Sequence, residues 1–239
     1  MKQADAVYEA MKNLGGFATF NQLNHTTNLG NWGTITPFAS IRRIVQQDKR
    51  FFKVKPGLWA LEEQRDKLAK IGVIADESAP EKAHNFEHGY YQGLLVEIGN
   101  VRQMQTFVPY QDKNRIFTGS QKLRDIVKLE KFYEFTYSKL VKRAITIDVT
   151  WFNERALPSA FFEVEHSTDI QNSLLKFLEL QDFRAQFHIV AAEARRNEFE
   201  AKLNYAAFKT IKSCIKFVNY DELAKMHSRE TEAAHSRVF

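Results

Sequence analysis

The sequence predicts an α+β protein in two parts, a small helical domain followed by an α/β core with a mixed sheet. Three observations support this prediction. Helical periodicity dominates the first fifty residues, which end in a short hairpin. A charged stretch with few apolar residues comes next. From about residue 85, apolar strand-like runs alternate with amphipathic helical runs.

The first part shows the order of elements of a winged helix. Gly15 ends the first apolar helical stretch, and Thr36 and Pro37 suit the N-cap and first position of another helix. The predicted helices cover residues 4–14, 20–26 and 37–48, and two short strands lie within 51–61. Three helices and a hairpin within about sixty residues predict a winged-helix domain.

The rest of the chain predicts an α/β core. Strands are expected at 104–110, 144–152, 160–167, 187–193 and 214–220, and helices at 88–103, 121–142, 169–181 and 196–208. We divide the chain into a winged-helix domain (1–62), a linker with one short helix (63–84), a core domain (85–225) and a frayed polar tail (226–239). We expect the part from about residue 85 to fold without the first domain.

Composition and charge restrict the possible functions. The single cysteine, Cys214, rules out a disulfide within the chain. No apolar run is long enough for a transmembrane helix, and the first residues lack the apolar segment of a signal peptide, so we expect a cytoplasmic protein. Residues 1–61 hold eight basic and three acidic side chains, which equals the whole net charge of +5, because the other 178 residues hold 26 of each sign. A basic patch of this kind suits a phosphate backbone or forms a solvated positive face.

Three carboxylates fall in neighbouring apolar strands. Asp148 lies in one predicted strand, and Glu163 and Glu165 lie in the next. Because side chains alternate along a strand, the two glutamates share a face, and pairing of the strands brings all three carboxylates together. Buried carboxylates without cations are costly, and Mg²⁺ relieves that cost through oxygen ligands. The cluster predicts metal-assisted attack of water on a phosphodiester, although any single one of these acids also suits the edge of a sheet.

The run ITIDVTWFNERALPSAFFEVEHSTDI resembles the catalytic strands of the PD-(D/E)xK nuclease superfamily, which includes many restriction endonucleases. The resemblance extends over residues 85–223 and implies that Asp148 and Glu163 bind the metal. The family lysine is replaced by Glu165, as in some restriction enzymes of the superfamily, so Glu165 either activates the water or binds a second metal ion. Lys176 on the following helix is a candidate for the missing ammonium, although a lysine there usually faces solvent.

Two further residues are candidates for accessory roles. Glu97 lies on the helix before the core, where the superfamily sometimes places an extra acidic ligand, and it also suits a plain surface position. His166 directly follows the acidic cluster and suits contact with phosphate, proton relay or a structural hydrogen bond.

Residues 5–61 resemble the HARE-HTH domain, a winged-helix module that is fused to restriction endonucleases and occurs in chromatin proteins. The matching features are Gly15-Gly16-Phe17, Thr34 to Pro37 and the ending PGLWAL. The resemblance implies that the third helix enters the major groove. We expect base contacts from Thr36, Ser40, Arg43 and Gln47, and phosphate contacts from Arg42, Lys49, Arg50, Lys53 and Lys55. A winged helix that binds protein is the alternative.

Together these features predict a Mg²⁺-dependent, sequence-specific double-strand DNA endonuclease of type II restriction type. The HARE-HTH resemblance implies that DNA modification blocks cleavage or is required for it. A single active site per chain favours a homodimer with two-fold symmetry over sequential nicking by a monomer. Two alternatives remain open, a non-catalytic DNA-binding regulator on a degenerate nuclease scaffold and a repair nuclease that recognises DNA structure.

Overall fold

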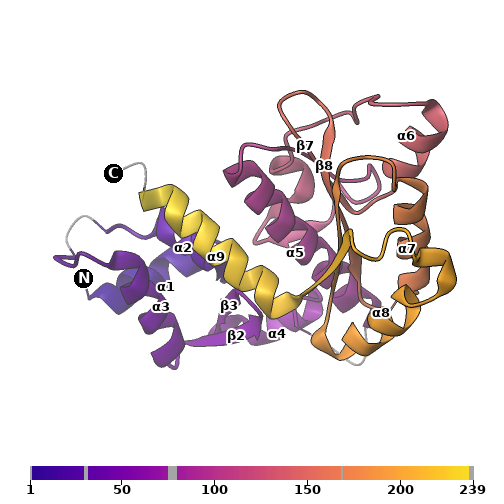
Figure 1. Cartoon of the computed structure of the whole chain (residues 1–239). Coiled ribbons are helices and arrows are strands. Elements are labelled where there is room, and N and C mark those ends of the chain that lie inside the picture. Colours follow the sequence, from indigo (N-terminus) through magenta and orange to yellow (C-terminus); the bar gives the residue numbers. More distant parts are fainter. Residues whose placement is uncertain (1, 30–31, 75–79, 168, 237–239) are drawn as a thin grey trace.

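The computed structural model describes residues 2–29, 32–74, 80–167 and 169–236 (Figure 1). Parts of the predicted linker (75–79) and of the predicted tail (237–239) therefore lie outside the described residues. Figure 1 shows a small helical part that contains α1 to α3, a larger part built on a sheet, and the helix α9, which extends from the sheet back to the small part. Within the described residues, no helix has both the length and the apolar composition needed to cross a membrane.

The three helices and the hairpin predicted for the first part are present. The elements are α1 (Gln3–Asn13), β1 (Phe17–Thr19), α2 (Phe20–Thr26), α3 (Pro37–Gln47), β2 (Phe51–Lys55) and β3 (Leu58–Leu61). The additional strand β1 joins the hairpin, and the sheet order is β1-β3-β2. At the start of α2, Thr19 and Gln22 form a capping box that satisfies two backbone N–H groups. Apolar side chains of all three helices share one core with the sheet: Val7, Met11, Leu23, Ile41, Val45 and Leu61.

The turn between β2 and β3 packs against the larger part. The Tyr90 hydroxyl donates a hydrogen bond of 2.8 Å to the carbonyl of Pro56. Gly57 has a φ of +78°, and a Cβ there would lie 3.0 Å from the Tyr90 hydroxyl and 3.1 Å from the Cβ of Ala224. Glycine therefore permits both the left-handed backbone and the close contact. The hairpin tip belongs to an interface inside the molecule.

A hydrophobic core crosses the boundary that the sequence predicts between the two parts. Phe17 and Leu58 of the first part belong to the same cluster as Tyr90 and other residues of α5 (Pro80–Val101). The predicted linker supplies the 3-10 turn η1 (Glu62–Gln64) and the short helix α4 (Arg65–Lys70), and Leu68 joins the cluster. The helix α5 begins eight residues before its predicted start at residue 88, so part of the predicted linker is helical.

A five-stranded sheet forms the larger part, and its mixed direction is as predicted. The strands are β4 (Gln105–Phe107), β7 (Val149–Phe152), β8 (Pro158–Glu165), β9 (Gln186–Ala191) and β10 (Ile215–Asn219), in the order β10-β9-β8-β7-β4. The β4-β7 and β7-β8 pairs are antiparallel, whereas the β8-β9 and β9-β10 pairs are parallel. One face of the sheet packs against α5, and the other packs against α7 (Ile170–Glu179) and α8 (Arg196–Leu203) (Figure 1). The 3-10 turns η3 (Glu193–Arg195) and η4 (Ala206–Phe208) flank α8.

Alternation along β8 determines which way the two glutamates point. Phe162 and Val164 belong to the core that contains α5, whereas Phe161 packs in the core that contains α7. Glu163 and Glu165 have the same parity as Phe161 and therefore face α7.

The helix predicted over 121–142 is wrong for most of its length. The segment continues the hairpin of β5 (Ile116–Thr118) and β6 (Gln121–Lys122) into the 3-10 turn η2 (Leu123–Asp125), and α6 covers only Ser138–Ala144. Between them, the Leu129 N–H donates to the Thr106 carbonyl, and the Phe132 ring lies 4.9 Å from that of Phe107 and 5.0 Å from that of Phe152. Contacts with the sheet thus replace the hydrogen bonds that a helix would make within itself.

The prediction of a frayed tail from residue 226 is also wrong for the described residues, because α9 covers Tyr220–Ser236. Within α9, His227 and Thr231 are only 2% and 3% exposed. The helix lies along α5 and reaches α2 (Figure 1). Its polar composition reflects the ion pairs and hydrogen bonds that α9 makes with both parts, for example between Glu232 and Arg42 and between His227 and Glu97.

Candidate active site

The candidate site lies where β7 begins and β8 ends. The β7-β8 register pairs Val149 with Phe162, so the next position places Asp148 opposite Glu163. The Oδ2 atom of Asp148 accepts a hydrogen bond of 2.7 Å from the backbone N–H of Val164. This bond extends the pairing of the two strands by one residue and fixes the Asp148 side chain at the end of the strand pair.

Glu163 is buried beside a lysine that comes from the helix. Only 3% of Glu163 is exposed, and the Nζ atom of Lys176 on α7 lies 2.8 Å from its Oε1 atom and 2.9 Å from its Oε2 atom. Burial, followed by the negative charge of Asp148, raises the pKa of Glu163 well above the ordinary value of a glutamate, and Lys176 opposes this shift. Lys176 therefore supplies an ammonium at the carboxylate cluster from outside the strand.

Glu165, where the sequence resemblance leads us to expect a lysine, is 4% exposed on the same face. The Ser173 hydroxyl of α7 lies within hydrogen-bond distance of carboxylate oxygens of both Glu165 and Glu163. Arg195 approaches the other Glu165 oxygen to 3.9 Å. A hydroxyl has one proton, so Ser173 can donate to only one of the two carboxylates at a time.

On the α5 side, Asp148 belongs to a second group of potential ligands. The Nε2 atom of His88 lies 3.2 Å from Oδ1 of Asp148, and one ligand atom each of His88, Asp112 and Asp148 lie within 4.8 Å of one another. Asp112 is 3% exposed and accepts hydrogen bonds from Gln92 (2.9 Å) and Arg115 (2.6 Å). Two carboxylates and an imidazole at this spacing suit a divalent cation.

The charge of His88 reflects this environment. Burial alone would lower the pKa of His88, but the hydrogen bond and negative charge of Asp148 outweigh burial and raise that pKa above its ordinary value. The sequence interpretation missed His88 and Asp112. The available signal was that His88 and Gln92 stand one helical turn apart, on the face of α5 that meets the start of β7.

The two accessory candidates occupy different places. His166 donates to or accepts from the Tyr220 hydroxyl at 2.7 Å and lies 3.6 Å from Glu87. Burial, followed by the positive charge on His88, lowers the pKa of His166 to about 3, so its ring is neutral at physiological pH. Glu97 lies elsewhere on α5, where it bonds to His227 of α9 and accepts a hydrogen bond from Asn21 of α2.

Among the residues predicted to contact bases, Thr36, Arg43 and Gln47 are exposed and Ser40 is partly buried along the outer side of α3. The residues predicted to contact phosphates differ more. Lys49 is exposed, and Lys53 is half-exposed at 3.9 Å from Asp221. Arg50 binds Asp48 and Asp5, Lys55 pairs with Glu87 at 3.4 Å with only 13% of its side chain exposed, and Arg42 pairs with Glu232.

Comparison with known proteins identifies the family. The family described as the C-terminal domain of the type II restriction enzyme NmeDI matches residues 73–236, which contain the whole candidate site. The type II restriction enzyme NmeDI of Neisseria meningitidis serogroup C is 26% identical over 152 residues, or 59% of this chain. The match covers 42% of that relative, so the chain spans less than half of its length. No solved structure matches significantly. The chain belongs to the family of the C-terminal domain of the type II restriction enzyme NmeDI.

Proposed function

We propose that this chain is a Mg²⁺-dependent endonuclease that cuts double-stranded DNA at a specific sequence, as a type II restriction enzyme. The observation that best supports the proposal is the contact of Lys176 with Glu163, opposite Asp148. PD-(D/E)xK sites combine two strand carboxylates with an ammonium, and these three groups meet here although Glu165 stands at the position of the family lysine. The type II restriction enzyme among the relatives of this chain agrees with the same chemistry.

The proposed roles follow from the geometry. Asp148 and Glu163 would hold the metal ion, and Mg²⁺, when bound, lowers the pKa of a water ligand and stabilises negative charge on the phosphate. Lys176 offsets the negative charge of Glu163, and its ammonium would donate hydrogen bonds to the scissile phosphate. Glu165, as a carboxylate, would take up the proton that the attacking water loses. Ser173 fixes the relative positions of the two glutamates.

The ligand set on the α5 side refines the proposal. We place His88 and Asp112 at the same metal centre, because one potential ligand atom of each lies within 4.8 Å of one of Asp148. An imidazole ligand suits Mn²⁺ better than Mg²⁺, which prefers oxygen ligands. In this arrangement His88 takes the place on α5 for which Glu97 was a candidate.

Incubation of the purified chain with Mg²⁺ and plasmid or genomic DNA from several sources tests the proposal. We expect discrete fragments, and no cleavage when Mg²⁺ is chelated. The Asp148→Asn and Glu163→Gln variants should lose cleavage and retain DNA binding. Glu200→Gln on the exposed side of α8 is the matched control and should cut as the unaltered chain does. Cleavage by either site variant at the unaltered rate would disprove the site assignment.

We also propose that the first part is a winged-helix DNA-binding domain. Its order of elements, α1-β1-α2-α3-β2-β3, suits that fold, and α3 presents Arg43 and Gln47 to solvent, where they can contact base edges. Residues 1–72 lie outside the matched family range, in agreement with a separate recognition role. Arg50 is held by two carboxylates and Lys55 is mostly buried, whereas Lys49 is exposed and the Lys53 side chain is 52% exposed with one long contact to Asp221, so we assign phosphate contacts first to Lys49 and Lys53.

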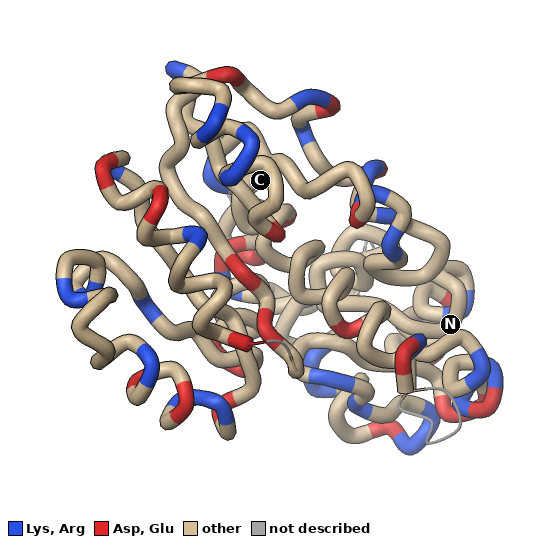
Figure 2. Tube along the Cα trace, turned by 90° about the vertical axis from the view of Figure 1, so that its right-hand side faces the viewer, with Lys and Arg blue, Asp and Glu red and all other residues tan. Residues whose placement is uncertain are grey.

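A second basic region lies in the core. Residues 113–143 contain nine Lys and Arg side chains and three Asp and Glu side chains, an excess that the balanced charge of residues 62–239 conceals. The helix α6 within this region ends four residues before Asp148. Figure 2 shows Lys and Arg around the N-terminal part and again over the upper part of the view. We propose that this region binds DNA phosphates near the active site.

A homodimer remains our proposal for cutting both strands, and sensitivity to DNA modification remains a proposal for the first domain. The alternative of a non-catalytic regulator depended on the missing lysine, and the position of Lys176 weakens that argument. Discrete fragments from intact duplex DNA would also argue against a nuclease that recognises branched or damaged structures.

A further inference from the structure

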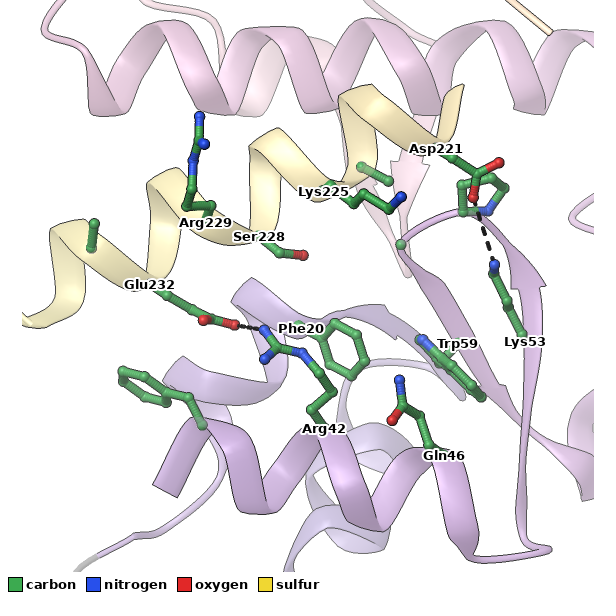
Figure 3. A pocket seen from close by; sticks show the side chains of 15 residues that line it. Phe20, Arg42, Gln46, Lys53, Trp59, Asp221, Lys225, Ser228, Arg229 and Glu232 are labelled. Carbon is green, nitrogen blue, oxygen red and sulfur yellow. Dashed lines mark hydrogen bonds and ion pairs between the residues drawn. The ribbon is translucent and has the colours of Figure 1, made fainter. Parts of the chain in front are cut away.

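A groove of about 810 Å³ separates α9 from the first part of the chain (Figure 3). One wall is formed by α9, and the other by α3 and the β2–β3 hairpin. The groove lies outside the candidate active site, and nothing in the proposed cleavage reaction uses it. Pockets for small ligands have volumes of about 300 to 1,000 Å³, and the groove falls within this range. The groove therefore suits a single nucleotide rather than a whole duplex.

The groove is lined by aromatic rings as well as by polar groups. Figure 3 shows the rings of Phe20 and Trp59 in the space between α3 and α9, with the Gln46 amide beside Trp59. The two ring centroids are 6.1 Å apart. Phe20 is buried, with the Arg42 guanidinium 5.4 Å above its ring, whereas Trp59 is only partly buried and offers the accessible ring. Aromatic faces stack on nucleobases, and each stacked base contributes about 1–3 kcal/mol. The exposed Gln46 amide and the Ser228 hydroxyl provide donors and acceptors for the edge of a base.

The charge of the groove suits a phosphate. Four cationic side chains line it, Arg42, Lys53, Lys225 and Arg229, against the two carboxylates of Asp221 and Glu232. Lys225 and Arg229 stand one turn apart on α9 and are exposed. The excess of positive charge attracts an anion with an aromatic group, which is the chemistry of a nucleotide.

Ion pairs stand at two places along the groove. Arg42 of α3 pairs with Glu232 of α9, and Lys53 of β2 lies 3.9 Å from Asp221 (Figure 3). Each pair joins a cation of the first part to an acid of α9. A phosphate carries the same sign of charge as these carboxylates and can replace them as the partner of either cation. Phosphate entry therefore requires exchange of a partner and leaves no cation unpaired.

We propose that this groove binds one extrahelical nucleotide of DNA, with its base on Trp59 and its phosphate between Lys225 of α9 and the cations of the first part. The proposal rests on the proposed function for the source of the nucleotide. A base taken out of the duplex exposes its hydrogen-bonding edge and any modification it carries. The helix α9 is thus part of the DNA-binding surface.

Tryptophan fluorescence of the full chain without divalent metal tests the groove while DNA remains uncut. The probes are a duplex with one bulged nucleotide, the fully paired duplex and free deoxynucleoside monophosphates. We expect the bulged duplex to quench fluorescence and to bind at least about fivefold more tightly than the paired duplex. Trp59→Phe should remove most of the quenching, because Phe keeps the ring but not the indole signal.

Charge variants identify the groove as the site. Lys225→Ala should weaken binding of the bulged duplex about fivefold or more, Glu232→Gln should strengthen it, and Lys209→Ala, exposed near η4, should leave it unchanged. Thermal melts would confirm that each variant is folded. Equal binding of bulged and paired duplexes, or an unaltered affinity of Lys225→Ala, would overturn the proposal. Tight binding of free monophosphates with no preference for the bulge would overturn DNA as the source of the nucleotide.

Failure of this proposal is distinguishable from failure of the nuclease assignment. A chain that cuts plasmid DNA but shows no bulge preference would overturn the groove proposal alone. If the Trp59 signal responds to the bulged duplex but the chain never cuts DNA with Mg²⁺, the nuclease assignment is overturned and the groove proposal stands.

Discussion

The Nζ atom of Lys176 lies 2.8 Å from Oε1 and 2.9 Å from Oε2 of Glu163, although the two residues belong to different elements. Glu163 stands on a central strand, and Lys176 stands on the helix that packs over it. An ammonium held this way contributes a charge that the strand itself lacks, because Glu165 occupies the next position on the same face.

Lys176→Ala should reduce DNA cleavage about a hundredfold or more, because an ammonium at the reacting groups is lost. Lys202→Ala is a matched control, since Lys202 has a similar exposure, 20% against 22%, and also pairs with a carboxylate, Asp169. Plasmid cleavage rates at saturating Mg²⁺ measure the effect. Equal rates for the two variants would show that Lys176 has only a structural role.

The same variant should change the pH dependence of stability. Burial raises the pKa of Glu163 in the folded chain, and the loss of Lys176 removes the charge that opposes this shift. A carboxyl whose pKa is raised in the folded chain destabilises the fold at pH values above its pKa in the unfolded chain, about 4.3. This penalty disappears as the pH falls toward about 4.3. Urea unfolding should therefore show a larger deficit for Lys176→Ala at pH 8 than at pH 5. A deficit that does not vary with pH would contradict this explanation.

His88→Ala should weaken binding of Mn²⁺ about tenfold, since one ligand group of the proposed metal centre is lost. Binding of Mg²⁺ should change less, because Mg²⁺ prefers oxygen ligands. Calorimetric titration with each ion gives both affinities without any requirement for activity. His84→Ala, an exposed histidine one turn earlier on α5, is the control. If both variants bind Mn²⁺ as the unaltered chain does, His88 does not belong to the metal centre.

The sequence predicted the strands of the core because they are apolar and bounded by polar turns. The strand predicted over 144–152 was too long, because β7 begins at Val149 and Asp148 lies just before it. It placed Glu163 and Glu165 on one face from the alternation of β8 alone, which the structure shows. The contact between Asp112 and Asp148 was not predictable in this way. It depends on the route of the loop after β4, which brings together residues 36 positions apart.

The two errors in secondary structure share a physical cause. Charged side chains in 121–142 suggested an exposed helix, but Leu129 and Phe132 bind this segment to the sheet. Polar side chains after residue 226 suggested a disordered tail, but partners such as Arg42 and Glu97 order them. In both places, contacts with distant residues determined the local structure.

A double change of Lys49 and Lys53 to alanine should flatten the salt dependence of DNA binding by up to ~2 units in log K against log salt. Lys55→Ala should leave the slope almost unchanged, because Lys55 is mostly buried against Glu87. Fluorescence anisotropy of a labelled duplex over a range of salt concentrations measures both. A loss of about one unit for Lys55→Ala would mean that Lys55 exchanges Glu87 for a phosphate.

His188 should contribute to acid unfolding. Its ring stacks on Phe162, with centroids 4.7 Å apart, and burial, followed by the charge of Lys216, lowers the pKa of His188 to about 4. A histidine with a lowered pKa favours the fold above its unfolded pKa of about 6.5, and this contribution is lost as the pH falls from 6.5 toward 4. The His188→Leu variant should therefore lose less unfolding free energy than the unaltered chain between pH 6.5 and pH 4. The expected difference is about 3 kcal/mol, which is the shift from about 6.5 to about 4 converted at about 1.36 kcal/mol per pKa unit. Parallel curves of unfolding free energy against pH for the two proteins would contradict the assignment.

The core shared between the two parts predicts that they unfold together. Phe17 and Leu58 pack in the same cluster as Tyr90, and the tip of the hairpin contacts both α5 and α9. A fragment that starts at residue 80 would expose the α5 surface that these side chains cover. We therefore expect the fragment to melt at a markedly lower temperature than the full chain and to bind a hydrophobic dye, contrary to the independent folding that the sequence suggests.

Calorimetry of the full chain tests the same coupling without truncation. Leu58→Ala removes a fully buried side chain from the shared cluster and should cost about 2–5 kcal/mol. Leu23→Ala, which lies in the core of the first part alone, is the matched control. In a coupled protein, both variants lower the temperature of one common transition. Two separate transitions, with Leu23→Ala shifting only one of them, would show independent domains. If a fragment from residue 80 cuts the same site with unaltered selectivity, the recognition role proposed for the first part is wrong.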